Sequence, residues 1–362
     1  AARRDLLVLT VDHRLQPAGA AWTRTCAATA ARLGAAFQAL CWTAEKPATG
    51  LPAAARAARH SLLADAARAA GASVILMGHT ADDILEARLM RTRGSTTPEP
   101  REWSPSPVWP EGRGVFLLRP LLGLRRAGIR DWLTTRGEGW IDDPANESPL
   151  SRRAQARRQI AGGGMGPGET AESASAEALA RVCRQDAAAG LQAPRACIAA
   201  ASPGVAARFL SAACLCAAGT SRPPPRQAIM RLVERLAAPD GFGATLAGAR
   251  IEADGETVRF LREAGEAARG GLRPLILAAG ESTVWDGRFE IAAERGREIR
   301  SARGLRQALS PADQHALAAL PANARDTVPV VVEESGPRLA DATPLALDRL
   351  LAACGAVETE PA

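Results

Sequence analysis

The sequence has no tyrosine and a single lysine, Lys46, so arginine supplies almost all of its positive charge. No uninterrupted apolar run approaches the roughly 20 residues that a membrane-spanning helix needs, which argues against a membrane partner. The first residues lack the apolar core and small-residue cleavage site of a secretory signal. They also lack an initiator methionine, so we expect the chain as printed to start downstream of the natural one.

Cysteine is scarce and irregularly spaced. The seven cysteines form no Cys-x-x-Cys pair, and Cys214 and Cys216 are separated by one residue only. An odd number at such spacing favours buried free thiols in a reducing compartment over disulfides or a zinc site. We therefore expect a cytoplasmic protein.

The chain is long and basic. Its 362 residues are 47% hydrophobic, which is enough for about two or three domains with buried cores. The formal net charge is +6, and arginine makes bidentate contacts with phosphate, so an RNA partner is compatible with the composition. Codon bias is the alternative, because an Arg- and Ala-rich, Lys-poor chain is typical of a GC-rich genome.

The most informative stretch is VILMGHTADDILEARLMRTRG, which begins at Val74. Its short apolar start predicts a buried strand, and apolar residues then recur at helical spacing. His79, Asp83 and Glu86 fall within about 60° of one another around that helix. One imidazole and two carboxylates on one helix face, directly after a strand, predict a ligand site at the strand's carboxyl end.

Two other interpretations fit the same residues. Thr80 followed three positions later by Asp83 matches the capping pattern of a helix start, so Asp83 can simply cap the helix. His and carboxylates at this spacing can also ligate a metal. No second cluster of His or Cys supports the metal site, and we assign no metal ligand.

Strands and helices alternate in the first part of the chain. Apolar runs predict strands at 6–11, 37–42 and 74–77, and helical patterns predict helices at 20–33 and 52–70. This alternation implies parallel strands joined by right-handed crossovers. The predicted fold class is therefore α/β, with a doubly wound parallel sheet.

Further polar residues are expected at the ligand edge of this sheet. Asp12 and His13 follow the first strand, in the way that His79 follows the third. Arg56 and Arg59 are three residues apart and share a face of their helix. Ordinary solvated helix surface is the competing interpretation of the two arginines.

The remaining chain divides at a glycine-rich linker, AGGGMGPG, at 161–168. We predict an α/β domain over 1–160, a mostly helical region over 169–268, and a small α+β region over 272–362. Within the first domain, the Pro-rich segment 94–114 is predicted to be a loop, of a length typical of a lid, a binding loop or a disordered segment.

Two shorter elements are also expected. A helical pattern covers about 125–136, and Asp286-Gly287 is a strong signal for a two-residue hairpin turn between flanking strands.

Six segments in a fixed order resemble the tRNA(Ile)-lysidine synthetases, a family of PP-loop ATP pyrophosphatases with an adenine-nucleotide α-hydrolase-like fold. Arg153 and Arg157 follow them, and Trp285–Phe289 resembles a C-terminal feature of the family. The segments are Val11–Leu15, Ala55–Arg59, Gly78–Glu86, Arg91–Ser95, Arg119–Leu122 and Ile141–Asn146.

The resemblance implies a ligase that uses ATP and Mg²⁺. The wobble cytidine of a minor isoleucine tRNA is activated at C2 as an adenylate, and the amine of free L-lysine then displaces AMP. The resulting lysidine changes decoding from AUG to AUA. The region 169–268 is then expected to bind tRNA.

The resemblance also implies roles for individual residues. Asp83, Glu86 and His79 would be catalytic, with the two carboxylates binding the lysine ammonium. Asp12 and His13 would contact the nucleotide. The residues expected to bind substrate are Arg56, Arg59, Arg91, Arg93, Asp143, Asn146, Arg153 and Arg157.

The sequence departs from the family in three places. The Ser-Gly-Gly-x-Asp-Ser phosphate loop, expected upstream of Leu6, is absent, so we expect the chain as printed to bind ATP poorly. Ala87 stands where the family has threonine, and the Pro-rich segment 96–114 replaces a glycine-rich one. The alternatives are a catalytically silent RNA-binding remnant, or another PP-loop tRNA-modifying enzyme. A thiolation enzyme usually needs paired cysteines, which the sequence lacks.

Overall fold

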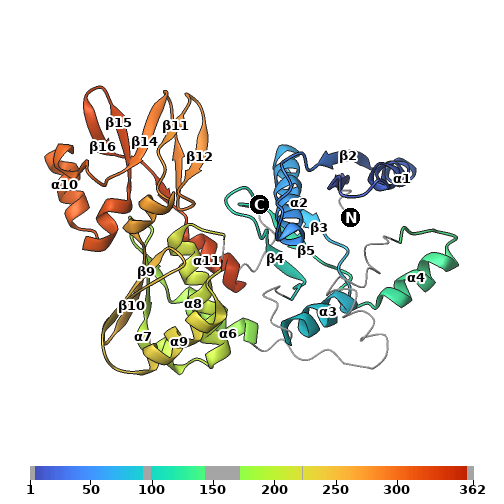
Figure 1. Ribbon diagram of the computed structural model, residues 1–362, viewed down its shortest axis with the longest axis horizontal. Coiled ribbons are helices and arrows are strands. Elements are labelled where there is room, and N and C mark those ends of the chain that lie inside the picture. The colour runs from blue at the N-terminus through green and yellow to red at the C-terminus, as the bar shows by residue number, and fades with distance from the viewer. Residues whose placement is uncertain (1–4, 93–98, 143–171, 222, 357–362) are drawn as a thin grey trace. The chain divides into compact units, whose positions relative to one another are not determined.

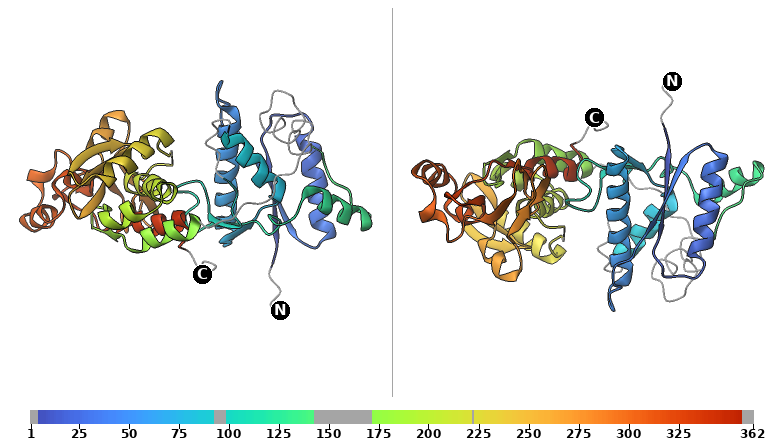
Figure 2. Two further views of the ribbon diagram at one scale, coloured as in Figure 1. Left: turned by 90° about the horizontal axis from the view of Figure 1, so that it is seen from below. Right: turned by 90° about the horizontal axis from the view of Figure 1, so that it is seen from above.

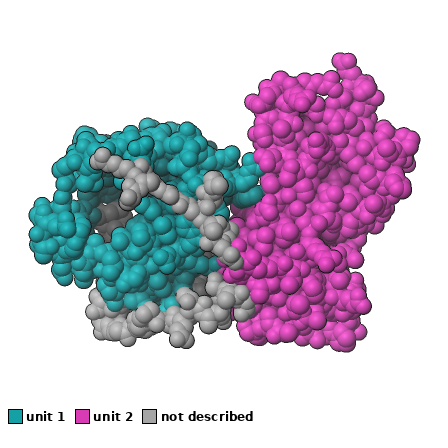
Figure 3. Space-filling view, turned by 180° about the vertical axis from the view of Figure 1, so that it is seen from behind, with its two compact units in different colours: residues 1–169, 360–362 teal, residues 170–359 magenta. Residues whose placement is uncertain are grey.

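The computed structural model describes residues 5–92, 99–142, 172–221 and 223–356. The chain forms two compact units, which Figure 3 shows in different colours. Unit 1 comprises residues 1–169 and 360–362, and unit 2 comprises residues 170–359. Within the described residues, no helix is both long and apolar enough to cross a bilayer.

Unit 1 begins with alternating strands and helices (Figure 1). Helices α1 and α2 flank β1 on opposite sides (Figure 2). The elements are β1 (Leu7–Asp12), α1 (Gly19–Arg32), β2 (Ala36–Cys41), α2 (Leu51–Ala69), β3 (Val74–Leu76), α3 (Ala81–Thr92), β4 (Trp103–Pro105), β5 (Phe116–Leu118) and α4 (Arg126–Thr135).

The predicted parallel α/β arrangement is confirmed. β1 pairs with β2 in parallel, and β3 pairs with β5 in parallel, with Val74 opposite Phe116. Backbone hydrogen bonds divide these strands into a two-stranded sheet, β1-β2, and a three-stranded sheet, β3-β5-β4. β4 runs antiparallel to β5. The segment 94–114 is therefore not wholly a loop, because it contributes this edge strand.

Helix α2 shows how local sequence sets the element boundaries of unit 1. Gly50 precedes the helix in the left-handed conformation (φ 70°), Pro52 occupies the first turn, and Gly71 (φ 69°) follows the last turn. The buried face of α2 carries small and apolar side chains together with His60. The sequence prediction of 52–70 is correct to within one residue at each end.

Unit 2 contains three antiparallel sheets and a layer of helices. Its elements are α6 (Glu172–Arg181), β6 (Arg184–Gln185), β7 (Leu191–Pro194), α7 (Arg195–Ala200), α8 (Pro203–Ala218), α9 (Arg226–Ala237), β8 (Phe242–Leu246), β9 (Ala249–Ala253), β10 (Thr257–Arg262), β11 (Leu275–Leu277), β12 (Ser282–Trp285), β13 (Phe289–Ala292), β14 (Arg297–Ser301), α10 (Pro311–Ala318), β15 (Pro329–Glu333), β16 (Gly336–Leu339), β17 (Thr343–Pro344), α11 (Ala346–Cys354) and three short 3-10 turns, η2 (Ala264–Arg269), η3 (Arg306–Ala308) and η4 (Ala322–Thr327).

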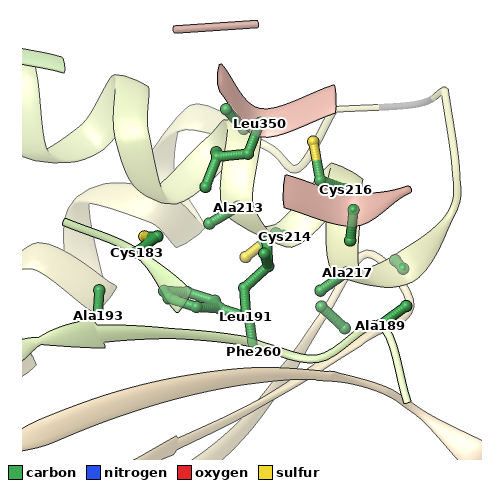
Figure 4. Close-up of a cluster of buried hydrophobic side chains, with 14 of the residues drawn as sticks. Cys183, Ala189, Leu191, Ala193, Ala213, Cys214, Cys216, Ala217, Phe260 and Leu350 are labelled. Atoms are coloured by element: carbon green, nitrogen blue, oxygen red, sulfur yellow. The ribbon is translucent and has the colours of Figure 1, made fainter. Parts of the chain in front are cut away.

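The core of unit 2 lies where α8 packs on the five-stranded sheet β6-β7-β10-β9-β8. Phe209 of α8 meets Phe260 of β10 edge-on, with ring centroids 6.3 Å apart, and both side chains are fully buried. Cys183, Cys214 and Cys216 lie in the same cluster (Figure 4).

The prediction that 169–268 is mostly helical needs correction. Five strands, β6 to β10, lie among the helices of this stretch, and the residues after 272 belong to the same compact unit. β9 explains the error, because its sequence Ala-Arg-Ile-Glu-Ala starts and ends in alanine, the residue with the strongest helix propensity. Its side chains nevertheless alternate between buried and half-buried.

The predicted hairpin at Asp286-Gly287 forms, but its turn is one residue longer than predicted. β12 and β13 pair with Trp285 opposite Phe289, so Asp286, Gly287 and Arg288 connect the strands, and Asp286 and Gly287 have φ of 48° and 64°. Gly287 is also required for space, because a Cβ there would lie 2.1 Å from the carbonyl oxygen of Gly219. The turn is thereby pressed against the end of α8.

A buried ionic cluster anchors this turn. Asp286 accepts hydrogen bonds from Arg262 Nε and Nη2, both at 3.0 Å, and from Arg288 Nε at 2.9 Å. Arg288 is fully buried and donates to the carbonyl oxygens of Ala188 and Thr327. Burial lowers the pKa of Arg288, and the charge of Asp286 opposes that shift. The cluster joins β10, the hairpin and η4.

Candidate active site

The site is built at the carboxyl ends of three strands of unit 1. β1 ends at Asp12, β3 is followed by His79, and β5 is followed by Arg119. Ligands of open α/β folds bind at this edge of the sheet. Helix α3 begins directly after β3 and carries the acidic residues.

Asp83 caps the start of α3 and lies near a second carboxylate, that of Glu86. Its Oδ2 accepts hydrogen bonds from Thr80 N at 2.9 Å and from Thr80 Oγ1 at 3.0 Å, so it does cap the start of α3. It also lies one turn from Glu86 on the same helix face. Asp83 is 8% exposed and Glu86 is 1% exposed. The capping role of Asp83 does not explain why a second carboxylate, that of Glu86, is also buried.

A cation of α4 lies against both carboxylates. Nη2 of Arg126 is 3.7 Å from Oδ2 of Asp83 and 3.7 Å from Oε1 of Glu86. The spacing is that of an ion pair without a hydrogen bond. The carboxylate pair therefore accommodates a cationic group, and sequence reasoning missed the residue that supplies it.

Asp82 holds α4 in this position. It accepts hydrogen bonds from the backbone N–H of Arg126 at 2.7 Å and from Nε of Arg125 at 3.1 Å. Burial alone would raise the pKa of Asp82, but these two hydrogen bonds and the charges of Arg125 and Arg126 together hold the pKa below its ordinary value. The carboxylate also satisfies an N–H group in the first turn of α4, which no backbone carbonyl can reach.

His79 is half-buried and is held by Arg119. Nε of Arg119 donates to Nδ1 of His79 at 3.2 Å. The Arg119 side chain is 5% exposed, and burial followed by the charge of Arg56 lowers its pKa. Arg119 belongs to one of the family-like segments, but no role was predicted for its side chain. Its position directly after a strand was the available signal.

Helix α2 contributes two arginines and one histidine to the same edge. Burial lowers the pKa of His60 to about 3, with further contributions from Arg59, Arg56, Arg119 and His79. Arg56 and Arg59 are half-buried, so neither side chain is fully solvated. His60 was not predicted as a site residue.

The β1 end joins this group through Arg59. Burial and then the charge of Arg59 lower the pKa of His13, while Asp12 opposes the shift. His13 meets Trp42 edge-on at 6.0 Å, and Nζ of Lys46 lies 3.8 Å from the centre of the Trp42 ring system. The only lysine of the chain therefore lies beside this corner.

Asp12 is fixed by its own loop. Its Oδ1 accepts a hydrogen bond from Arg14 N at 2.8 Å. A Cβ at Gly19 would lie 2.6 Å from the same oxygen, so a larger residue at this position would require the carboxylate to move. This close approach keeps the end of β1 and the start of α1 in contact.

The structure thus places Asp83 and Glu86 beside the same guanidinium. Electrostatic interactions link His13 to Arg59, and link His60 to Arg56, Arg59 and His79. Asp12 lies at the end of β1, and the remaining predicted site residues cannot be placed. Those outside the described residues are Arg93, Asp143, Asn146, Arg153 and Arg157, together with the side chain of Arg91.

Comparison with known proteins finds relatives that match most of the chain. Residues 2–162 match the PP-loop domain family. The chain is 49% identical over 335 residues to a tRNA(Ile)-lysidine synthase of Caulobacter vibrioides, covering 92% of this chain and 78% of that protein. It is 35% identical over 323 residues to a tRNA(Ile)-lysidine synthase of Hyphomonas neptunium, covering 82% and 84%.

Among solved structures, a U34-tRNA thiolase from Methanococcus maripaludis with its [4Fe-4S] cluster matches 44% of this chain and 56% of that one. Its TM-score is 0.36 and its identity 13%, a likeness too low to bear on this chain. The two similar tRNA(Ile)-lysidine synthases identify the family. This chain belongs to the tRNA(Ile)-lysidine synthase family.

Proposed function

We propose that this protein is a ligase that joins free L-lysine to C2 of the wobble cytidine of a minor isoleucine tRNA, using ATP and an adenylated intermediate. The observation that carries the proposal is the buried pair of Asp83 and Glu86, with a cation 3.7 Å from each. Two carboxylates that already accommodate a guanidinium suit the ammonium of a lysine substrate.

The proposed reaction has two steps. The C2 oxygen of the cytidine first attacks the α-phosphorus of ATP, and pyrophosphate leaves. The lysine amine then forms a C–N bond to C2, the C2–O bond breaks, and AMP leaves with the bonding electrons. The amine also loses a proton. Asp83 and Glu86, the acidic residues of α3 on the site face, would accept it.

The phosphates of ATP need positive charge. Arg56 and Arg59 lie half-buried at the same edge and would supply it. Asp12 and His13 would contact the nucleotide. Among the described residues, no group of three or more His, Cys, Asp or Glu side chains could hold a metal by itself. A nucleotide-bound Mg²⁺ needs only one or two carboxylates beside phosphate oxygens, and Asp12 offers one at the end of β1.

The tRNA contacts form a further part of the proposal. We assign Arg91, Arg93, Asp143, Asn146, Arg153 and Arg157 to substrate binding, and the region 169–268 to the tRNA. The net charge of +6 supports a phosphate-rich partner. All seven cysteines are free, which supports our proposal of a cytoplasmic enzyme.

The test is incorporation of labelled lysine into minor isoleucine tRNA. Two proteins are compared, the chain as printed and a chain with a Ser-Gly-Gly-x-Asp-Ser loop placed ahead of Leu6. We expect ATP-dependent incorporation by the chain that carries the loop, with weaker incorporation by the other. Absence of incorporation by both proteins would refute the ligase.

The second candidate is a catalytically silent RNA-binding protein, favoured by the arginine-rich composition and the net charge of +6. Both candidates predict binding of tRNA that weakens steeply as salt rises. They differ in the first step of the reaction. Only the ligase transfers AMP from ATP to the tRNA when lysine is omitted.

A further inference from the structure

The side chain of Arg119 makes three hydrogen bonds that fix its position. Nε donates to Nδ1 of His79 at 3.2 Å, and Nη1 donates to the carbonyl oxygen of Arg101 at 2.7 Å and to Ser104 Oγ at 2.9 Å. The backbone N–H of Arg119 also donates to the carbonyl oxygen of Glu102 at 2.7 Å. The guanidinium is therefore held between β4 and the histidine.

The contact with His79 has a chemical consequence. A guanidinium has only donors, so Nδ1 of His79 must be the acceptor in this hydrogen bond. An imidazole nitrogen can accept only when it carries no proton. An imidazolium carries protons on both nitrogens, and the other neutral tautomer carries its proton on Nδ1. The hydrogen bond is thus compatible with one form alone, the neutral ring with its proton on Nε2.

We propose that Arg119 is a positioning residue that holds His79 in the neutral Nε2–H form. His79 then presents a hydrogen-bond donor to the reacting nucleotide, and it is not the base that removes the proton from the lysine amine. The inference rests on the proposed function for the identity of the substrate. Its statement about the histidine stands on the geometry alone.

The proposal also gives the Pro-rich segment a purpose. Ser104 belongs to β4, and Arg101 lies just before it. Both lie in the segment whose sequence differs from the family pattern. Through these two contacts the edge strand supports Arg119, and Arg119 in turn supports His79. The segment would then act on the chemistry without touching the substrate.

The neighbouring charged groups must be considered in any titration of His79. Helix α2 contributes His60, which interacts electrostatically with His79, and Arg56, which interacts with Arg119. Helix α3 contributes the carboxylates of Asp83 and Glu86, four and seven residues after His79. Arg119 differs from all of them in donating directly to the ring.

Nitrogen NMR of the protein labelled with ¹⁵N-histidine tests the proposal. The chain has only four histidines, and a His79→Gln variant identifies the signals of His79. In the wild-type protein we expect the cross-peak pattern of the Nε2–H tautomer, unchanged between about pH 5 and 8. A wild-type ring with its proton on Nδ1, or protonated on both nitrogens at neutral pH, would overturn the proposal.

Two variants sharpen the measurement. Arg119→Met removes the donor, so His79 should populate both tautomers and should gain a proton within the same pH range. Ser104→Ala removes one support of Arg119 but leaves the contact with His79, and it should keep the wild-type pattern. If Arg119→Met leaves the His79 pattern unchanged, the positioning role is wrong. If the variant does not fold, the wild-type spectrum still decides.

The activity assay separates this inference from the proposed function. In the lysine-incorporation assay, Arg119→Met should lower kcat and change its dependence on pH, with the KM for tRNA within a few-fold of wild type. If no protein incorporates lysine, the ligase is refuted, whereas the NMR result on His79 remains valid. If lysine is incorporated and His79 carries its proton on Nδ1, the ligase stands and the inference falls.

Discussion

Nη2 of Arg126 lies 3.7 Å from Oε1 of Glu86, a carboxylate that is almost completely buried. The same guanidinium nitrogen is equally far from Oδ2 of Asp83. Arg126 is half-buried, so it can swing away from the pair without unfolding a helix. A lysine ammonium bound to these carboxylates would compete with it for the same negative charge.

We expect Arg126→Gln to lower the KM for lysine. Removing a competing cation at a partly exposed site is worth about 1 kcal/mol, which corresponds to roughly a fivefold change. The measurement is lysine incorporation at saturating ATP and tRNA. Arg125→Gln is the matched control, because Arg125 pairs with Asp82 and contacts neither carboxylate of the pair. An unchanged or higher KM in Arg126→Gln would show that the two cations do not compete.

Asp83→Asn should abolish lysine transfer and leave the fold intact. Asparagine keeps an oxygen that can accept from Thr80, so the cap survives, but the negative charge for the ammonium is lost. We expect transfer to fall by at least ~100-fold and tRNA affinity to stay within a few-fold. Lysine incorporation, tRNA binding and thermal unfolding measure the three effects.

Asp82→Asn provides the comparison for this variant. Asp82 faces α4 and accepts from Arg125 and Arg126, so its loss should lower the stability of unit 1 by roughly 1 to 2 kcal/mol. Transfer should fall much less than in Asp83→Asn. Equal loss of transfer in both variants would mean that Asp83 acts through folding and not through lysine.

His60 should make unit 1 sensitive to acid. Its folded-state pKa is about 3, below the ordinary value of 6.5, so the unfolded chain binds more protons between these limits. The stability contribution is therefore complete above about pH 6.5 and is lost as pH falls toward 3, by at most about 1.4 kcal/mol per pH unit. Urea unfolding at several pH values measures this loss of stability.

His60→Leu should flatten this dependence. Neither ring nitrogen of His60 has a hydrogen-bond partner among the described residues, so leucine breaks no such bond, and stability at neutral pH should change little. His315→Gln, at an exposed position of α10, is the control and should keep the wild-type slope. A wild-type slope in His60→Leu would contradict the buried neutral imidazole.

Asp286→Asn should destabilise unit 2 strongly. Asparagine tolerates the positive φ of this turn position, so the change removes the charge and leaves the backbone unstrained. Arg262 and Arg288 would then be two buried cations without their shared carboxylate, at a cost of about 3 to 5 kcal/mol.

Urea unfolding of unit 2 measures the loss at Asp286. Asp254→Asn is the control, since Asp254 lies in an exposed turn and accepts from Glu256 and Thr257. We expect that variant to lose about 1 kcal/mol at most. Similar losses in the two variants would mean that the ionic cluster contributes little.

Most strands and helices of unit 1 could be predicted because their apolar periodicity is strong. β1, β2 and α2 lie within one residue of their predicted bounds. β4 was missed because its three residues, Trp103-Ser104-Pro105, include a proline in a Pro-rich segment. An edge strand tolerates proline, and only its pairing with β5 reveals it.

The candidate site was predictable only where its residues are close in sequence. The spacing of Asp83 and Glu86 alone predicts that they share a helix face. In the structure that face lies at the end of β3, because α3 begins directly after this strand. Arg126 comes some 40 residues later, and a hydrogen bond to Asp82 brings it there. Such a contact depends on how α4 packs, which no periodicity reports.

The thiols of unit 2 provide a built-in probe of its unfolding. Burial raises the pKa of Cys183, Cys214 and Cys354 to about 12 and that of Cys216 to about 11, so these four carry no appreciable thiolate at neutral pH. Alkylating reagents should label Cys197, which is exposed, at once. Labelling of the other four should proceed only as fast as the core around α8 opens. The labelling rate would then measure how fast this core opens, without any engineered dye site.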